Sequence, residues 1–493
     1  MIQPNKPNTK LLILLAFFVY SFSAFAQSNS GAPQFNGPKI TGNYPNTDFL
    51  FTVPVSGQKP ISFKAENLPA GLSIDESTGI ITGNVKEKGI YATTITATNA
   101  AGTNKQNITI NIGDKLCLTP LMGWNTWNVF TYDISEKMLM EMADAMVSSG
   151  MRDLGYQYIN IDDFWHADVR EKNGKPKVDS VKFPHGMKYL SDYIHSKGLK
   201  LGIYSCAGTM TCGKRFGGYN YEEIDAKTYA EWGIDLLKYD YCFAPWGRKT
   251  AEERYTKMGT ALKNSERSIV FSVCEWGIRK PWLWAKNTGG SYWRITPDIF
   301  DVWNHPAVWQ YSVMAILKRA EKVSKYSFPG GWNDMDMMLV GNYGNGKATS
   351  ANGMFKGLTD LEYESHMALW CLFNSPLLAS CDLRTMNDAT KNILTNSNLL
   401  NISQNTLGKS AKLVSKKNGI RMFEKELLGG AKIIAVLNYS EKEKSLKGYF
   451  NKKELSELNH AQNVLSGKNM SQSELETLNI KPHQTIIFKL TGK

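Results

Sequence analysis

Acidic, basic and tryptophan side chains recur at the ends of short apolar runs in the middle of this 493-residue chain. In the clearest case, residues 236–242, two leucines lead into Lys238 and then Asp240. Burying a carboxylate is costly unless it is paired or binds polar groups, so repeated acids in such places indicate a polar site. The same pattern supplies Trp124, Trp127, Asp162, Asp163, Glu275, Arg294, Asp298, Asp334 and Asp336.

Two chemistries use a site of this composition. In retaining glycoside hydrolysis one carboxylate attacks the anomeric carbon, while a carboxylic acid about 5–5.5 Å away protonates the leaving oxygen. Metal-dependent hydrolysis uses a carboxylate cluster, usually with histidine ligands. The seven histidines do not fall in pairs at the ends of apolar runs, so we expect a glycosidase without metal or organic cofactor. A non-catalytic sugar-binding surface protein is the alternative from a different class.

The segment from Cys117 to about Asn405 alternates β-type runs with helical-period stretches such as Ser135–Ser149 and Met187–Lys197, which predicts βα units and a parallel sheet. Eight such units in roughly 290 residues is the size of a (β/α)8 barrel, whose active sites lie at the C-terminal strand ends. The predicted strands are Leu121–Trp127, Tyr156–Asp163, Leu199–Ala207, Ile234–Asp240, Ile269–Glu275, Tyr292–Ile295, Gly331–Met337 and Pro376–Ser380.

Each polar residue also has a structural interpretation that the local sequence leaves open. Asp240, like the pair Asp162–Asp163, would also suit the cap of a following helix. Arg294 lies four residues before Asp298 and would also serve only to neutralise it as an ion pair. The spacing of the acids along the predicted barrel, rather than any one of them, therefore carries the functional hypothesis.

The regions on either side of the barrel segment have β texture, so we predict a multidomain chain. Residues 38–114 contain β-branched runs at short intervals and resemble immunoglobulin-like modules of bacterial surface proteins. A spacer role is favoured for this unit over sugar binding, which stays open as the alternative. Residues 115–406 form the predicted TIM barrel. Residues 407–493 are predicted to form an antiparallel β-sandwich. A segment rich in Ser, Gly, Pro and Asn, residues 27–37, is predicted to be a linker.

The first 26 residues have the features of a secretory signal peptide. Lys6 and Lys10 precede an apolar core, and Ala24-Phe25-Ala26 matches an A-x-A cleavage site. We therefore expect export to the periplasm or the medium, and no transmembrane segment in the mature chain. The net charge of +12 is spread along the sequence without a dense Lys/Arg run, so we expect no nucleic-acid partner.

At seven places the barrel segment resembles glycoside hydrolase family 27, whose best-known members are α-galactosidases. The resemblance covers residues 118–407, and each motif lies at a predicted strand. The motifs are Thr119–Asn128, Ile161-Asp162-Asp163, Gly198–Tyr204, Leu237-Lys238-Tyr239-Asp240, Cys274-Glu275-Trp276-Gly277, Trp293–Ile299 and Pro329–Met337.

The resemblance implies a role for each candidate. Asp240 would be the nucleophile and Asp298 the general acid and base. Lys238 would bind sugar hydroxyls and favour ionised Asp240. Asp162 and Asp163 would accept hydrogen bonds from the 4- and 6-hydroxyls, and Arg294 and Glu275 would bind the 2-hydroxyl. Trp127 would pack under the sugar ring. The pocket would be lined by Tyr204, Asp336 and Met337.

The resemblance further implies a disulfide between Cys212 and Cys242 beside the pocket. Gly290 occupies the place of the family partner of Cys274, so we expect a free thiol at Cys274. Cys206 stands where many relatives carry an aspartate, which bears on fine specificity. The redox states of Cys117, Cys206, Cys371 and Cys381 and the oligomeric state are left open.

The implied substrate is an oligosaccharide or glycan with terminal α-D-galactose. Glu275 fits family members that accept a free 2-hydroxyl, which disfavours N-acetylgalactosaminidase activity. A β-L-arabinopyranosidase on the same scaffold is the closest alternative, because that sugar differs from α-D-galactose only in lacking the 6-hydroxymethyl group.

Overall fold

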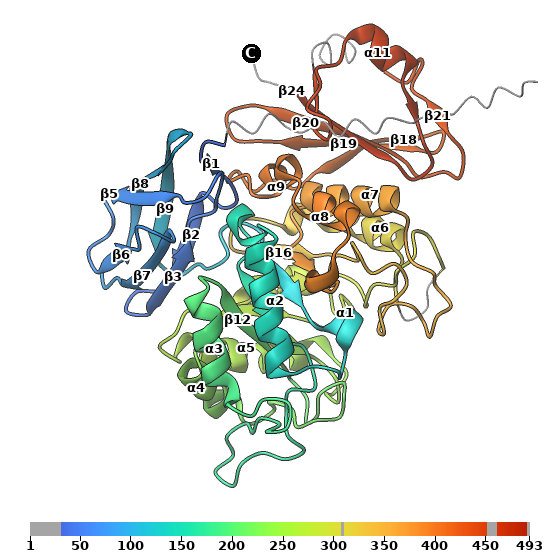
Figure 1. Cartoon of the computed structure of the whole chain (residues 1–493). Coiled ribbons are helices and arrows are strands. Elements are labelled where there is room, and N and C mark those ends of the chain that lie inside the picture. Colours follow the sequence, from blue (N-terminus) through green and yellow to red (C-terminus); the bar gives the residue numbers. More distant parts are fainter. Residues whose placement is uncertain (1–30, 307–309, 451–460, 491–493) are drawn as a thin grey trace, which may run out of the picture.

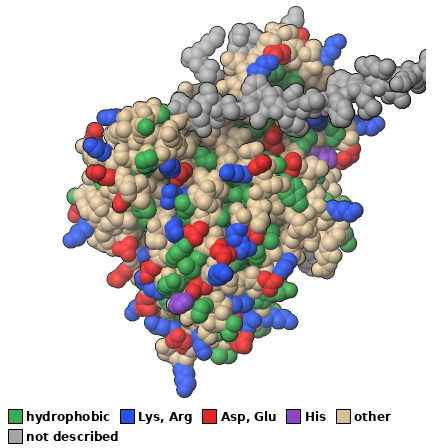
Figure 2. Space-filling model, in the orientation of Figure 1, with side chains coloured by type: hydrophobic (Ala, Val, Ile, Leu, Met, Phe, Trp, Pro, Cys, Tyr) green, Lys and Arg blue, Asp and Glu red, His purple; other side chains and the backbone are tan. Residues whose placement is uncertain are grey.

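The computed structural model describes residues 31–306, 310–450 and 461–490. The expected signal peptide, Met1–Ala26, lies outside these residues. Within them, no helix combines the length and the apolar character needed to cross a bilayer. On the face shown in Figure 2, acidic and basic side chains are interspersed rather than gathered into fields of one sign.

The middle of the chain is a (β/α)8 barrel, as predicted. Eight strands form one parallel sheet in the order β16-β15-β14-β13-β12-β11-β10-β17. A parallel bridge between Met338 and Ala379 joins the two edges. The strands are β10 (Met122–Asn125), β11 (Tyr158–Asn160), β12 (Lys200–Cys206), β13 (Leu236–Asp240), β14 (Val270–Val273), β15 (Tyr292–Arg294), β16 (Trp332–Asp334) and β17 (Leu377–Ala379).

Helices follow the strands and cover the outside of the barrel (Figure 1). Ser135 caps α2 through the N–H of Met138, and Thr359 with Glu362 forms a capping box on α7, so both helices begin where the local sequence satisfies free N–H groups. The helices are α1 (Trp127–Phe130), α2 (Glu136–Ser148), α3 (Gly186–Ser196), α4 (Glu222–Glu231), α5 (Arg248–Lys263), α6 (Val313–Val323), α7 (Asp360–Leu372), α8 (Asp388–Leu394) and α9 (Ser397–Ser403).

Alternate residues of the strands give the barrel interior an apolar floor and a polar upper part. Because side chains along a strand point to opposite faces in turn, every second residue faces the barrel axis. The apolar cluster contains Tyr158, Leu236, Val270, Tyr292, Trp332 and Leu378. Two positions further along the same strands stand Asn160, Lys238, Ser272, Arg294 and Asp334, which line a small inner cavity.

The N-terminal unit is a β-sandwich of two sheets, ordered β2-β9-β8-β5 and β3-β7-β6, around a core that includes Phe51, Ile81 and Ile95. Its strands are β2 (Ile40–Asn43), β3 (Asp48–Thr52), β5 (Ser62–Glu66), β6 (Leu72–Ile74), β7 (Ile80–Asn84), β8 (Gly89–Asn99) and β9 (Gly102–Ile112).

Of the predicted linker, residues 27–37, the structure describes residues 31–37, and there it differs from the prediction at one point. Gln34–Phe35 form strand β1, which pairs antiparallel with β4 (Val55–Ser56), and Phe35 packs against the sandwich core. The composition of the segment does not predict this strand, because a two-residue strand forms through its pairing partner and not through local propensity.

The N-terminal sandwich packs against the bottom of the barrel, at the end opposite the C-terminal strand ends. The hydroxyl of Thr52 donates to the carbonyl of Gly198, just before β12, over 2.6 Å. The backbone N–H of Tyr44 donates to Ser268 Oγ, just before β14, over 2.8 Å. Both contacts lie at the starts of barrel strands, so this unit does not line the C-terminal strand ends.

The C-terminal region contains a five-stranded antiparallel sheet, β18-β19-β20-β24-β22, that lies across α7, α8 and α9 in Figure 1. One face, with Phe423 and Ile487, joins the barrel core, and the other packs on a second apolar cluster around Leu475. The elements are β18 (Lys412–Lys417), β19 (Ile420–Glu426), β20 (Lys432–Asn438), β21 (Lys444–Ser445), β22 (Gln462–Asn463), α11 (Gln472–Thr477), β23 (Asn479–Ile480) and β24 (Thr485–Leu490).

Candidate active site

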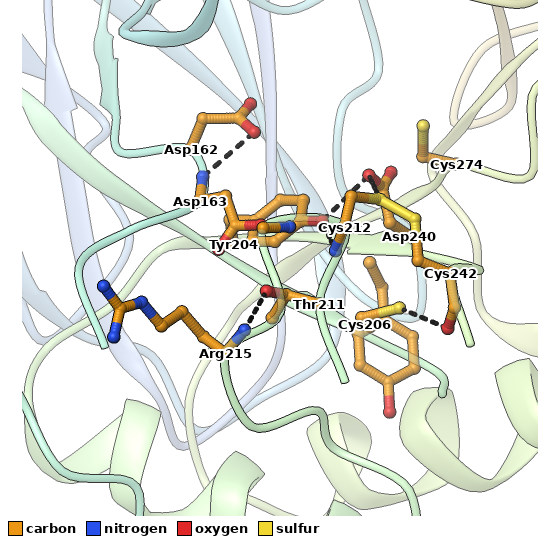
Figure 3. Close-up of a disulfide and its surroundings, with 12 residues drawn as sticks. Asp162, Asp163, Tyr204, Cys206, Thr211, Cys212, Arg215, Asp240, Cys242 and Cys274 are labelled. Atoms are coloured by element: carbon orange, nitrogen blue, oxygen red, sulfur yellow. Dashed lines mark hydrogen bonds between the residues drawn. A yellow bond between two sulfur atoms is a disulfide. The ribbon is translucent and has the colours of Figure 1, made fainter. Parts of the chain in front are cut away.

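Asp240, the last residue of β13, is buried at the C-terminal mouth of the barrel (Figure 3). Tyr204, on the neighbouring strand β12, donates its hydroxyl to Asp240 Oδ2 over 3.0 Å. The other oxygen, Oδ1, has no nitrogen or oxygen donor among the described residues. Burial raises the pKa of Asp240 to about 6, against the ammonium of Lys238, which lowers it. Tyr204 therefore holds Asp240 from one side, and the other oxygen receives no N–H or O–H hydrogen bond from the described residues.

The disulfide between Cys212 and Cys242 forms the wall beside Asp240 (Figure 3). It ties the loop after β12 to the first residues after β13 across 30 positions of sequence. Sγ of Cys212 lies 3.3 Å from Asp240 Oδ2. Because both sulfurs are joined in the disulfide, the group Cys212, Asp240 and Cys242 offers no thiolate to a metal.

Asp162 and Asp163 follow β11 and are both almost fully buried. Asp162 Oδ2 accepts from Asn125 Nδ2 over 3.0 Å and from Lys238 Nζ over 2.7 Å, and its Oδ1 accepts from the N–H of Asp163. Asp163 accepts from the N–H groups of Phe164 and Gly213, both over 2.7 Å. Burial raises the pKa of Asp163, against these two backbone hydrogen bonds. The pair is a fixed acceptor surface and not a helix cap.

Lys238 lies on β13 two residues before Asp240, and its nearest carboxylate is Asp162. Burial opposes its charge, yet the pKa of Lys238 lies well above its ordinary value because Asp162 and Asp240 stabilise the ammonium. One cation thus compensates two carboxylates of the mouth.

Asp298 differs from the buried Asp240 in its exposure, because 36% of its side chain is accessible to solvent. Arg294, at the end of β15, binds Asp298 Oδ1 over 2.9 Å and Asp336 Oδ2 over 2.8 Å. Asp336 Oδ2 also accepts from the N–H of Ile299, next to Asp298, over 2.8 Å. Burial raises the pKa of Asp336 to about 7, against the guanidinium of Arg294. Asp336 and Arg294 therefore hold the segment that carries Asp298.

Cys274 follows β14, between the strands that carry Asp240 and Arg294. It is a buried free thiol, as expected, and Nη1 of Arg294 lies 3.8 Å from its sulfur. Because Tyr239 pairs with Val273, the next residues, Asp240 and Cys274, stand side by side at the mouth. The thiol of Cys274 therefore lies between Asp240 on one side and Arg294, the partner of Asp298, on the other.

The remaining predicted site residues take three different positions. Trp127 is partly buried, and its ring stacks on that of Phe164 with centroids 6.2 Å apart. Met337 is buried at the rim of the inner cavity. Glu275 is fully buried, and its Oε2 accepts from the N–H of Arg279 over 2.7 Å and from its guanidinium over 3.2 Å. The structure thus pairs Glu275 with Arg279 and with none of the other candidates.

Several turns at the mouth place a non-glycine residue in the left-handed region of backbone conformation. Among them are Phe164 after β11, Phe243 after β13, Trp276 after β14 and Asp336 after β16, with φ of 75°, 48°, 59° and 77°. Such strained residues cluster at functional sites, where the surrounding packing holds them.

Sequence reasoning missed Asn125, Asn160 and Ser272. Asn125 binds Asp162, and all three line the inner cavity beneath the acids. The sequence did contain a signal for them. Each lies an even number of positions from an inward-facing residue of its strand, so its side chain faces the barrel axis as well. Uncharged residues in apolar runs are commonly core, which is why the pattern alone did not mark them.

Comparison with known proteins agrees with this geometry. A family model described as "Alpha galactosidase A" matches residues 119–405, and one described as "Putative Ig domain" matches residues 32–113. Alpha-galactosidase A of Cellvibrio japonicus is 39% identical over 396 residues, which cover 77% of this chain and 94% of that protein. The alpha-galactosidase of Cyamopsis tetragonoloba is 46% identical, over 62% of this chain and 69% of its own.

A solved structure from Bacteroides fragilis, described as a "putative alpha-galactosidase/melibiase", superposes with a TM-score of 0.89 at 48% identity. The match covers 93% of this chain and 98% of that one, so it includes the flanking β units as well as the barrel. The barrel, the acids at its mouth and these matches agree, and the chain belongs to the α-galactosidase family of glycoside hydrolases, family 27.

Proposed function

We propose that this protein removes terminal α-D-galactosyl residues from oligosaccharides with retention of configuration, using Asp240 as nucleophile and Asp298 as general acid and base. The observation that carries the proposal is the difference between the two carboxyl groups. Asp240 is buried and held by Tyr204, whereas Asp298 is partly exposed and held by Arg294. A nucleophile must face the sugar inside the pocket, and an acid must reach the leaving group and then water.

In the first step an oxygen of Asp240 bonds to the anomeric carbon as the glycosidic bond breaks, and Asp298 gives its proton to the departing oxygen. In the second step water attacks the anomeric carbon, and Asp298 takes the proton of that water. The carboxylate of Asp240 leaves, so the enzyme returns to its starting state. Two inversions give the α-anomer of galactose as the first product.

Asp162 and Asp163 are proposed to bind the 4- and 6-hydroxyls of the galactosyl ring. A carboxylate offers about four acceptor positions. Asp162 uses three of them on protein donors, which leaves one for a sugar hydroxyl. The pair is rigid because backbone N–H groups and Lys238 hold it, so an axial 4-hydroxyl would meet preplaced acceptors.

The other predicted residues are proposed to shape the pocket. Trp127 supplies an aromatic face below the ring, and Tyr204 and Met337 supply walls. Arg294 is proposed to contact the 2-hydroxyl from its position between Asp298 and Asp336. Glu275 is proposed to act through Arg279, because that contact occupies its Oε2.

The experiment compares hydrolysis of aryl α-D-galactopyranoside, aryl β-L-arabinopyranoside and aryl N-acetyl-α-D-galactosaminide. Wild type is run beside Asp240→Asn, with Asp192→Asn as a matched control, because Asp192 is an exposed acid paired with Lys188. We expect the galactoside to be the best substrate, α-galactose to appear first by NMR, and activity to be lost only in Asp240→Asn.

Two results would contradict the proposal. Preference for the arabinopyranoside would indicate a β-L-arabinopyranosidase whose pocket wall excludes the 6-hydroxymethyl group of galactose. Sugar binding with no turnover of any of the three by wild type would indicate a binding protein.

We also infer that the chain is exported after removal of Met1–Ala26. The N-terminal sequence supports this, and the disulfide between Cys212 and Cys242 suits an oxidising compartment. Expression in a Gram-negative host, followed by N-terminal sequencing, tests it. Protein starting at Gln27 in the periplasm or medium would agree, and full-length protein confined to the cytoplasm would contradict it.

A further inference from the structure

Trp246 is an exposed aromatic residue on the rim of the barrel mouth. It lies in the loop between β13 and α5, six residues after Asp240, and is 79% exposed. An indole in water gives up the hydrophobic stabilisation that burial would provide. Single exposed apolar residues are common, but Phe243 in the same loop and Ile278 beside Arg279 are also exposed, by 47% and 45%, so Trp246 belongs to an exposed apolar group at this rim.

The structure holds this indole against a fixed cation. The guanidinium of Arg279 lies 4.6 Å from the ring centroid of Trp246 and 4.4 Å from that of Tyr241. Arg279 is itself buried and bound to Glu275 through both its backbone and its side chain. The guanidinium therefore contacts the indole from a fixed position, and most of the indole surface faces solvent. Holding the ring in this way reduces the entropy lost when a ligand stacks on it.

The rim position of Trp246 places it next to the catalytic groups. Trp246 is four positions after Cys242, which limits the distance between their Cα atoms to about 14 Å. Cys242 is bonded to Cys212, whose sulfur touches Asp240. From the other side, Glu275 adjoins Cys274, which contacts Arg294, the partner of Asp298.

We propose that Trp246 stacks on the sugar to which the terminal galactose is attached and so forms an aglycone subsite. This inference rests on the proposed function. If the terminal galactose fills the buried pocket at Asp240, the next sugar must lie at the rim. A pyranose has an apolar C–H face that packs on an aromatic ring, and its hydroxyls stay in water at an exposed site. The favoured substrate is then a galactosylated oligosaccharide and not a small galactoside.

The test compares substrates that differ only in the leaving group. α-D-Galactopyranosyl fluoride has no aglycone ring, whereas raffinose has a disaccharide leaving group. For Trp246→Ala we expect kcat/KM on raffinose to fall about 10-fold, mostly through KM, which corresponds to about 1.4 kcal/mol. Activity on the fluoride should change by less than about 2-fold, because the galactosyl pocket is untouched.

Two further variants complete the design. Trp246→Phe keeps an aromatic face and should retain most activity on raffinose. Ile90→Ala removes an equally exposed apolar side chain from the N-terminal sandwich and should change neither substrate. Melting temperatures of all variants are measured in parallel.

The possible failures are distinct. Equal losses on both substrates would give Trp246 a structural role, and no loss on raffinose would remove the subsite; either result overturns the inference. Wild type that does not hydrolyse the fluoride would instead contradict the proposed function.

Discussion

Lys238 Nζ lies 2.7 Å from Oδ2 of Asp162, although the two residues are separated by 76 positions of sequence. Lys238 and Asp240 belong to one strand face, so the same cation that compensates Asp162 also acts on Asp240. The mouth therefore contains one cationic residue shared between Asp162, a proposed sugar-binding acid, and Asp240, the proposed nucleophile.

Replacing Lys238 by methionine should raise the pKa of Asp240, because the ammonium now lowers it. Loss of a nearby opposite charge shifts a carboxyl pKa by about 1–3 units. The acid limb of the kcat/KM profile, expected near pH 6 in wild type, should move to higher pH by about one unit or more. Lys200→Met is the control, because Lys200 is at the opposite end of the barrel, and an equal shift in both variants would contradict the assignment.

Asp298→Asn should lose activity according to the leaving group. General acid catalysis contributes about 10²–10⁴-fold, and only where the departing oxygen needs a proton. We expect a large loss on raffinose and a small effect on the first step with a 2,4-dinitrophenyl galactoside. Asp240→Asn should fail on both, since it removes the proposed nucleophile. Uniform loss across leaving groups in Asp298→Asn would show that Asp298 is not the acid.

The stability of the protein should fall as pH rises from about 5 to 7.5, while activity increases. Burial raises the pKa of Asp240, Asp225 and Asp301 to about 6 and of Glu275 and Asp336 to about 7. Between an ordinary carboxyl pKa near 4 and these values, the folded state binds more protons than the unfolded state. His166 and His366, whose pKa burial lowers, act in the opposite direction, but the five carboxyl groups outnumber them. The net stability therefore decreases with rising pH in this window. Calorimetry at several pH values checks this, and a melting temperature that rises from pH 5 to 7.5 would refute it.

Removing the disulfide with Cys212→Ala and Cys242→Ala together should lower both stability and kcat. Closing a loop of 30 residues contributes about 3–4 kcal/mol to the free energy of unfolding. The kcat falls because Cys212 packs against Asp240. Dithiothreitol should lower the melting temperature of wild type and of Cys117→Ala, which retains the disulfide, but not that of the double variant. If dithiothreitol also lowered the melting temperature of the double variant, it would be acting on a group other than this disulfide.

The sequence by itself determined the barrel and the places of its acids. All eight strands lie within the ranges predicted from their apolar runs, and Asp162, Asp240, Arg294 and Asp334 lie at or just after strand ends. This information is local, because a strand that is buried on both faces must be apolar and a polar residue is tolerated only where that strand opens to the site.

Only the tertiary structure decided the partners of these residues. Glu275 binds Arg279, Arg294 bridges Asp298 and Asp336, and Trp246 stands exposed on the rim. The same holds for β1, which forms because β4 lies beside it. These relationships depend on the register between strands and on loop paths, and no local pattern encodes the distance between residues that are far apart in the chain.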